Sequence, residues 1–300
     1  MTSVRAVDHV IAAHATSDGD GVKIQRLAGF NNTRFSPFLM IDELKSDESK
    51  DYVGGFPPHP HRGIETLTYM LQGHFQHKDH MGNVGELRSG GAQWMAAGRG
   101  VIHSEMPMME EGVLHGFQIW INQPATHKMQ PAQYHDFQSE SIAEHRGASR
   151  SIAEHQSEQN GLLRVIAGVF ELHNLADHDV EALRTQGPLQ QTGVPLSVAD
   201  WRSHSGQKIT LGIDVNHNAM TYVYRGSIKI GDKVINQGQL ALLTKADLLS
   251  LSSLEDSGVL IFSGEPINEP VAHYGPFVMN SMEEIEQTIQ DYNNGVFETY

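Results

Sequence analysis

The chain has 300 residues and a formal net charge of −15 at pH 7. A surface this acidic cannot easily present a basic face. We therefore expect no direct nucleic-acid partner. Cysteine is absent, which excludes disulfides, thiol catalysis, cysteine-ligated zinc and iron–sulfur clusters. No apolar run approaches the roughly 18 residues of a membrane span. Residues 1–21 carry charges and histidines within their apolar part and make a poor signal peptide. We therefore expect a cytoplasmic protein with no membrane partner.

Short β-rich runs separated by turn signals follow one another along most of the chain. In chain order they include TLTYML, AQWMAAGRG, HGFQIWI, LLRVIAGVF, PLSVADW, KITLGI, MTYVYRGSIKI and GVLIFSGE. Many short strands at regular spacing, joined by glycine-rich turns, predict an all-β sandwich or barrel.

One good helix is expected near the end of the sequence, in NSMEEIEQTIQDYNNG. Asn280 or Ser281 is the predicted N-cap, acidic residues fill the first turn, and Gly295 marks the end. Ile285 and Ile289 lie four residues apart and therefore share one side of this helix.

Two polar segments are expected to be surface loops. Ser139 to Gly161 contains a local duplication, SIAEHRGASR followed by SIAEHQSEQN, which we interpret as a tolerated insertion without an assigned role. Ala176 to Pro195 is similarly polar and rich in turn residues.

A larger repeat divides the chain into two copies of one β-module. TLTYMLQG at 66–73 resembles AMTYVYRG at 219–226, and SGGAQWMAAG at 89–98 resembles NQGQLALLTK at 236–245. Sliding the first copy onto the second places Gly212, Asp214 and Asn218 where His59, His61 and Glu65 stand, and, with a short gap, Ser250 and Ser252 where His103 and Glu105 stand. The second copy is expected to keep the scaffold and lose the polar residues.

Two histidine-containing pairs in the first copy predict a metal site. His59 and His61 in FPPHPHRG, like His103 and Glu105 in VIHSEMP, are two residues apart and share one face of a strand. On neighbouring strands, the two pairs would converge on one point. Three imidazoles and a carboxylate suit one divalent ion: Fe(II), Mn(II), Ni(II), Cu(II) or Zn(II).

Other polar residues nearby have weaker assignments. Glu65 shares the face of His61 if the strand is regular, and we expect it to orient a ligand imidazole rather than to bind the metal. His115 is a candidate for the cavity wall, although a core histidine paired with a neighbour is equally consistent with the sequence. His74, His77 and His80 recur at three-residue spacing beside an expected turn, which favours an exposed loop.

Four segments together resemble the pirin branch of the cupins: GGFPPHPHRGIETLTYMLQG, AQWMAAGRGVIHSEMP, HGFQIWIN and SGEPINEPVAHYGPFVMNS. The resemblance implies a bicupin, with two β-barrel or jelly-roll domains and a C-terminal helix. It places the N-terminal metal-binding cupin over residues 1–135, a cupin without metal ligands over 136–275, and a helical tail over 276–300. It also implies a metal, usually iron, held by residues matching His59, His61, His103 and Glu105.

The resemblance further implies two classes of function. One is a dioxygenase that cleaves a flavonol such as quercetin with O₂ at a mononuclear Fe(II) site, with Glu105 as the catalytic carboxylate; its partners are a small aromatic substrate and O₂. The other is a regulatory protein, a transcriptional co-regulator or redox sensor, whose metal tunes contact with a protein partner. A zinc hydrolase is less favoured, because four protein ligands would leave tetrahedral zinc no open position.

Overall fold

A computed structural model describes residues 3–139, 153–157, 161–173 and 182–297. The chain divides into two compact units. The N-terminal domain comprises His14–Glu140, Thr192–Val194 and Ile267–Tyr300, and the C-terminal domain comprises Met1–Ala13, Ser141–Gln191 and Pro195–Pro266. This division differs from the expected boundaries at both ends of the sequence. The first strand pairs within the C-terminal domain, and the segment after residue 266 belongs to the N-terminal domain.

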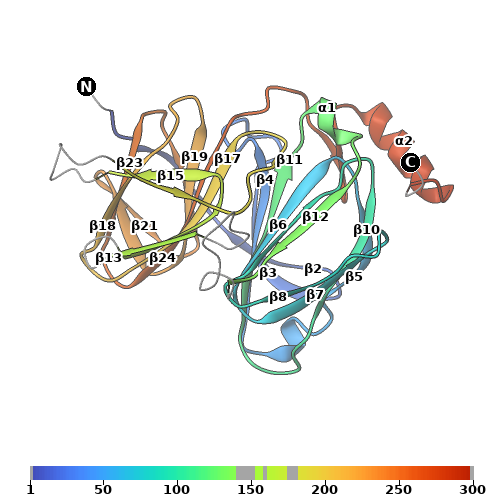
Figure 1. Ribbon diagram of the computed structural model, residues 1–300, viewed down its shortest axis with the longest axis horizontal. Helices are drawn as coiled ribbons and strands as arrows, with labels where there is room; N and C mark the ends of the chain where they lie inside the picture. Colours follow the sequence, from blue (N-terminus) through green and yellow to red (C-terminus); the bar gives the residue numbers. More distant parts are fainter. Residues whose placement is uncertain (1–2, 140–152, 158–160, 174–181, 298–300) are drawn as a thin grey trace. The chain divides into compact units, whose positions relative to one another are not determined.

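Two antiparallel sheets build the N-terminal domain (Figure 1). The larger, in the order β12-β9-β6-β11-β4-β3-β2, consists of β2 (His14–Asp18), β3 (Val22–Ala28), β4 (Phe38–Ser46), β6 (Ile64–Gln72), β9 (Ala92–Ala96), β11 (Leu114–Asn122) and β12 (Gln133–Phe137). The smaller, in the order β5-β10-β7-β8, consists of β5 (Phe56–His61), β7 (His74–Asp79), β8 (Val84–Arg88) and β10 (Val101–Pro107). The remaining elements are the 3₁₀-helix η1 (Ser49–Asp51), α1 (Ala125–Lys128), the pair β25 (Ala272–Tyr274) and β26 (Phe277–Met279), and α2 (Met282–Asn293).

The C-terminal domain repeats this two-sheet architecture. One sheet, in the order β1-β22-β19-β24-β17-β14-β13, consists of β1 (Val7–Ala12), β13 (Ala153–Ser157), β14 (Gly161–Ala167), β17 (Leu196–Ser203), β19 (Asn218–Arg225), β22 (Gln239–Leu243) and β24 (Ser257–Gly264). The other, in the order β16-β15-β18-β23-β20-β21, consists of β15 (Val169–Leu172), β16 (Leu183–Gln186), β18 (Lys208–Gly212), β20 (Ser227–Ile230), β21 (Lys233–Asn236) and β23 (Leu248–Ser253). The all-β prediction is confirmed.

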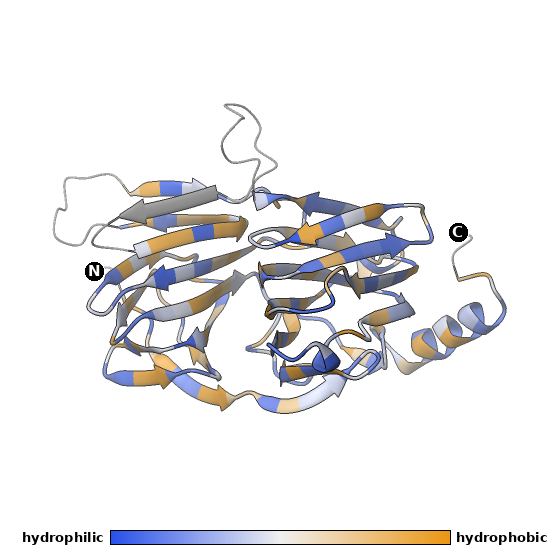
Figure 2. Ribbon diagram, turned by 90° about the horizontal axis from the view of Figure 1, so that it is seen from below, coloured by the Kyte–Doolittle hydropathy of each residue, from blue (hydrophilic) through white to orange (hydrophobic). Residues whose placement is uncertain are grey.

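Alternation of apolar and polar residues along the strands explains the two-sheet packing (Figure 2). In the C-terminal domain the inward-facing side chains form one large apolar cluster, which includes Trp201, Leu211 and Leu249. The N-terminal domain has apolar clusters as well. It also buries many polar side chains, among them Thr68, His77, Gln93, His103 and Glu105. The C-terminal domain buries polar side chains as well, such as Asp200, but the buried histidines and glutamates of the described residues all lie in the N-terminal domain.

Helix α2 follows the sequence-based prediction. Ser281 is the N-cap, and it forms a capping box with Glu284, which satisfies backbone donors at the helix start. Ile285 is 1% exposed and belongs to an apolar cluster with Phe277 and Phe297, against which Ile289 packs. Within the described residues, no helix is both long and apolar enough to cross a membrane.

The two polar segments are described only in part. Most of the duplication falls on residues 140–152 and 158–160, outside the described residues. Its described portion, β13, pairs with β14 and is therefore a strand where a loop was expected. Residues 174–181 also lie outside the description, and within the second segment β16 pairs with β15.

Candidate metal centre

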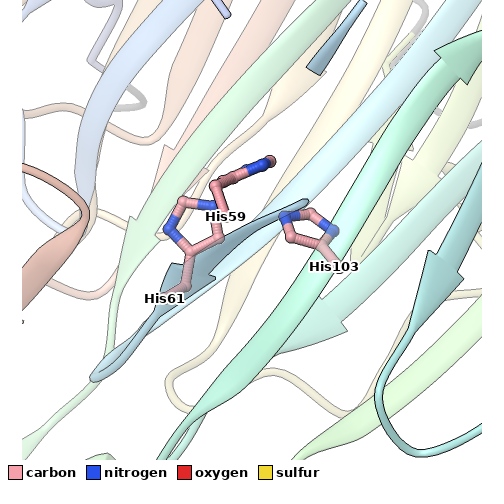
Figure 3. A group of neighbouring side chains, drawn as sticks. All are labelled: His59, His61 and His103. Atoms are coloured by element: carbon pink, nitrogen blue, oxygen red, sulfur yellow. The ribbon is translucent and has the colours of Figure 1, made fainter. Parts of the chain in front are cut away.

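Three of the four predicted ligands meet on the smaller sheet of the N-terminal domain. Strands β5 and β10 pair so that His59 lies opposite His103, and His61 lies two residues further along β5. One nitrogen from each ring falls within 4.8 Å of the other two. Figure 3 shows the three rings turned toward one another. The i, i+2 alternation of a strand thus brings the rings together as the sequence predicted.

Backbone carbonyls fix the tautomers of two of these rings. Nδ1 of His59 is 2.8 Å from the carbonyl oxygen of Pro57, and Nδ1 of His61 is 3.3 Å from that of Pro276. A carbonyl oxygen can only accept a hydrogen bond, so each Nδ1 must carry the proton and donate it. The lone pair of each ring therefore resides on Nε2, the atom that remains for a metal.

The third ring is held in a similar way by a histidine. Nδ1 of His103 lies 3.4 Å from Nδ1 of His77. Nε2 of His103 is buried and has no hydrogen-bond partner among the described residues. A buried polar nitrogen without a partner costs free energy, and a cation between the three rings would satisfy it. The donor set therefore fits a divalent metal ion.

Burial keeps the imidazoles of His61 and His103 neutral. The pKa of His61 is lowered to about 3, first by burial and then by neighbouring His59. The pKa of His103 is lowered well below its ordinary value, again chiefly by burial and further by the other histidines. Neutral imidazole is the form that binds a metal, so both rings are in the required state at neutral pH.

Glu105, the fourth predicted ligand, lies beside this group but not within it. Its Oε2 accepts a hydrogen bond from Nε2 of Gln118 at 2.7 Å, and its Oε1 lies 3.0 Å from Oγ1 of Thr68. The β5–β10 register shifts between His103 and Glu105, but the β10–β7 register is regular there, so the extra residue of the bulge lies in β5 and not beside the carboxylate. Direct ligation by Glu105 stays a prediction.

Strand β7 corrects the interpretation of the GHFQHKDH segment as an exposed loop. His77 is 2% exposed and lies opposite Glu105, while Asp79 lies opposite His103. Sequence reasoning missed both residues because the three-residue histidine spacing hid the His77–Asp79 alternation. That i, i+2 pair, preceded by buried Phe75, is the signal that could have revealed them.

Glu65 and His115 both have hydrogen-bond partners outside the group of three histidines. Glu65 accepts hydrogen bonds from Nε1 of Trp94 at 2.9 Å and from the backbone N–H of Gly193 at 2.7 Å. Burial raises its pKa to about 7. Nε2 of His115 lies 2.8 Å from Oε1 of Glu43. His115 is thus paired with a neighbour, one of the two possibilities that the sequence allowed, and orientation of a ligand imidazole by Glu65 stays a prediction.

The segment after residue 266 completes the surroundings of β5. Besides the Pro276 carbonyl, it contributes Asp291, which pairs with Arg62 at 2.7 Å. It also provides the carbonyl oxygen of Val278, which accepts a hydrogen bond from buried Lys128 at 3.0 Å. Lys128 donates to the carbonyl of Gly63 as well, at 2.8 Å. The turn that follows His61 is thereby fixed on two sides.

A cavity of about 750 Å³ opens onto the histidines. Its wall includes His59, His61 and Glu105. Aromatic side chains also line it, namely Phe30, Phe56 and Trp120, as do charged ones, namely Asp18, Asp20, Arg26 and Asp42. Trp120 meets the His61 ring edge-on at 5.1 Å. The size falls within the roughly 300–1,000 Å³ of small-molecule sites, and the aromatic wall suits a planar, apolar ligand with polar substituents.

Comparisons with known proteins agree with this geometry. Residues 21–121 match the Pirin family, and residues 198–298 match the Pirin C-terminal cupin domain. A Vibrio cholerae protein named as a candidate quercetin 2,3-dioxygenase is 61% identical over 300 residues, covering 100% of both chains. The crystal structure of a quercetin 2,3-dioxygenase from Acinetobacter baumannii has a TM-score of 0.83 at 31% identity, covering 98% of this chain and 99% of that one.

A more distant structure is similar in fold alone. It is that of a bacterial pirin from Escherichia coli in complex with nickel(II), with a TM-score of 0.62 at 20% identity, covering 86% of this chain and 100% of that one. Together, the two-sheet domains, the full-length relative and the two family matches show that this chain is a bicupin and belongs to the pirin family.

Proposed function

We propose that the protein is a metal-dependent dioxygenase that cleaves a flavonol such as quercetin with O₂ at a mononuclear Fe(II) site. One observation carries the proposal: one nitrogen from each of His59, His61 and His103 lies within 4.8 Å of the other two, and His59, His61 and Glu105 line a cavity. The names of the relatives support the same activity. The donor set alone does not select iron among the first-row divalent ions.

His59, His61 and His103 are the residues that would hold the metal, with Glu105 as the predicted fourth ligand. A bound divalent ion supplies Lewis acidity, which lowers the pKa of a substrate hydroxyl that contacts it. The chain's contribution to this centre is the fixed set of tautomers described above, which presents lone pairs without reorganisation.

Glu105 is the group placed to take the proton of that hydroxyl. Its carboxylate reaches the cavity, and Gln118 and Thr68 hold it in place. General acid–base catalysis of this kind contributes about 10²–10⁴-fold to a rate. Phe30, Phe56 and Trp120 offer aromatic surface to the rings of the substrate and exclude water from it.

Anaerobic metal loading followed by turnover tests this proposal. Metal-free protein is loaded separately with Fe(II), Mn(II), Ni(II), Cu(II) or Zn(II), mixed with quercetin and exposed to O₂. Loss of flavonol absorbance, O₂ uptake and the mass of the product are recorded. We expect a ring-opened product and the fastest turnover with Fe(II). If none of the metals gives such a product, quercetin is not the substrate.

Glu105→Gln tests whether the carboxylate takes part in turnover. The substitution keeps the volume of the side chain but removes its charge and basicity. We expect kcat for the loaded protein to fall by about 10²-fold or more. An unchanged kcat would contradict the role assigned to Glu105. Metal binding without turnover of any flavonol would instead favour the regulatory hypothesis.

A further inference from the structure

A chain of three buried polar side chains leads from the ligand group into the sheet. Nδ1 of His103 lies 3.4 Å from Nδ1 of His77, and Nε2 of His77 lies 3.3 Å from Oδ2 of Asp79. The residues sit on the paired strands β10 and β7, where Asp79 is directly opposite His103. Side-chain exposure is 3% for His77 and 0% for Asp79. Such burial shields the chain from competing water.

Asp79 is held as a fixed acceptor. Its Oδ1 accepts from the backbone N–H groups of Met81 at 3.0 Å and Asn83 at 2.9 Å, and its Oδ2 accepts from Nδ2 of Asn83 at 2.8 Å. An ionised carboxylate can only accept hydrogen bonds. Nε2 of His77 must therefore carry a proton and donate it to Asp79.

The direction of the next hydrogen bond follows. A neutral imidazole with its proton on Nε2 has its lone pair on Nδ1, so Nδ1 of His77 can accept from Nδ1–H of His103. His103 then has its lone pair on Nε2, the buried atom that has no partner in the described part of the chain. The opposite direction would place a proton on that Nε2 and prevent it from binding a metal. Of the two directions, only the first lets Asp79 accept and leaves His103 ready to act as a ligand.

Packing fixes the plane of the intermediate ring. Tyr134 stacks on His77, with ring centroids 4.4 Å apart and an angle of 20° between the planes. Rotation of the imidazole would disturb this stacking and both hydrogen bonds. The ring is therefore held in the orientation that His103 requires.

We propose that His77 and Asp79 are positioning residues that hold His103 in the tautomer and orientation needed to bind the metal. This inference rests on the metal site of the proposed function. It extends to His103 the arrangement that carbonyl oxygens provide for His59 and His61. Groups that orient a metal-binding histidine typically change metal affinity about 10–100-fold when they are removed.

The test measures metal binding rather than turnover. His77→Phe keeps a ring against Tyr134 but removes both nitrogens. We expect the Ni(II) affinity of the full-length, metal-free protein to fall about 10–100-fold. With Cu(II) as a paramagnetic probe, we expect the nitrogen hyperfine pattern of the bound ion to change, because the His103 ring is no longer held toward it.

Two further variants separate positioning from packing. His77→Asn places an amide oxygen near the position of Nδ1, where it can accept from His103, so we expect it to recover part of the lost affinity. His115→Phe is the matched control. It removes another histidine of the same domain that is bonded to a buried carboxylate, that of Glu43, and we expect unchanged Ni(II) affinity. Circular dichroism and thermal unfolding without metal report the fold of each variant.

The outcomes separate this inference from the proposed function. Wild-type Ni(II) affinity and an unchanged hyperfine pattern in His77→Phe would overturn the inference alone. Equal losses in His77→Asn and His77→Phe would overturn it in favour of a packing role. Absence of metal binding by the wild-type protein would overturn both proposals.

If His77→Phe does not fold, Asp79→Asn replaces it. This variant removes the charge that fixes the tautomer and is expected to weaken Ni(II) binding, and unchanged affinity there overturns the inference.

Discussion

The two domains place a threonine at matching positions of the repeat, and the two hydroxyls have different surroundings. Thr68 on β6 lies opposite Gln118 on β11, and its Oγ1 is 2.6 Å from Oε1 of that glutamine. Thr221 on β19 lies opposite Ile261 on β24. Its Oγ1 is buried and has no hydrogen-bond partner among the described residues. The C-terminal domain thus retains the threonine of this network, while an apolar residue takes the place of Gln118.

The ligand positions differ between the domains in the same way. His59 lies opposite His103 in the β5–β10 pair, whereas Thr210 lies opposite Ser250 in the β18–β23 pair. The hydroxyls of Thr210 and Ser250 hydrogen-bond each other at 2.9 Å. With Ser250 matched to His103, the register places Thr210 rather than Gly212 at the position of His59. The ungapped sequence alignment was wrong by two residues, because Asn218 follows Thr210 by eight positions, whereas Glu65, its match, follows His59 by six.

Substituting the matching residues His103 and Ser250 tests this contrast. The His103 variant should show the largest effect. His103→Ala deletes one of the three nitrogen donors. The loss of Ni(II) affinity should exceed the roughly 10–100-fold typical of losing a group that only orients a ligand. Ser250→Ala alters the matching position and should leave the metal content unchanged. Elemental analysis after loading and gel filtration provides the measurement, and equal metal in both variants would contradict the assignment of the site.

A buried carboxylate makes the N-terminal domain sensitive to pH. The pKa of Glu65 is raised from 4.5 to about 7, chiefly by burial. The folded state therefore binds this proton more tightly than the unfolded state does. The resulting stabilisation is complete below about pH 4.5 and is lost as the pH rises through about 7.

Glu65→Gln isolates this pH dependence, because glutamine is similar in shape but does not titrate. The matching residue of the C-terminal domain, Asn218, is likewise neutral. At about 1.4 kcal/mol per pKa unit, the wild-type protein should lose about 3 kcal/mol of unfolding free energy relative to the variant between pH 4.5 and 7.5. Urea unfolding at a series of pH values measures the difference. A gap between the two proteins that does not change with pH would contradict the raised pKa.

Substituting the two threonines should give smaller changes of opposite sign. An unpaired buried hydroxyl costs about 1–3 kcal/mol, so Thr221→Val should raise the unfolding free energy of the C-terminal domain by about 1 kcal/mol. Thr68→Val should lower that of the N-terminal domain by a similar amount, because the Oε1 atoms of Gln118 and Glu105 lose the single hydroxyl donor that they share. Calorimetry of the metal-free proteins checks both signs, and a destabilised Thr221→Val would show that its hydroxyl is satisfied.

Sequence alternation was sufficient to predict the histidine group, because side chains two residues apart in a strand share a face. It could not predict the contact of the Pro276 carbonyl with His61, since a backbone acceptor 215 residues away has no side-chain signature. His77 and Asp79 were missed for a different reason: the polar composition of their segment resembled a turn, while its alternation was that of a half-buried strand. Glu65 does not share a strand with His61 as the sequence suggested, because the chain leaves β5 after His61 and enters β6 of the other sheet. Its partners come from β9 and from the distant Gly193.

The position of Pro276 in the chain has a consequence for biosynthesis. The carbonyl that fixes the tautomer of His61 is translated only after the whole C-terminal domain has been made. A nascent chain that has released both sheets of the N-terminal domain from the ribosome still lacks this acceptor, together with the Asp291 partner of Arg62. Loading of the centre is therefore expected late, once synthesis has passed these residues, and a ribosome stalled before residue 276 should carry a folded but poorly metallated domain.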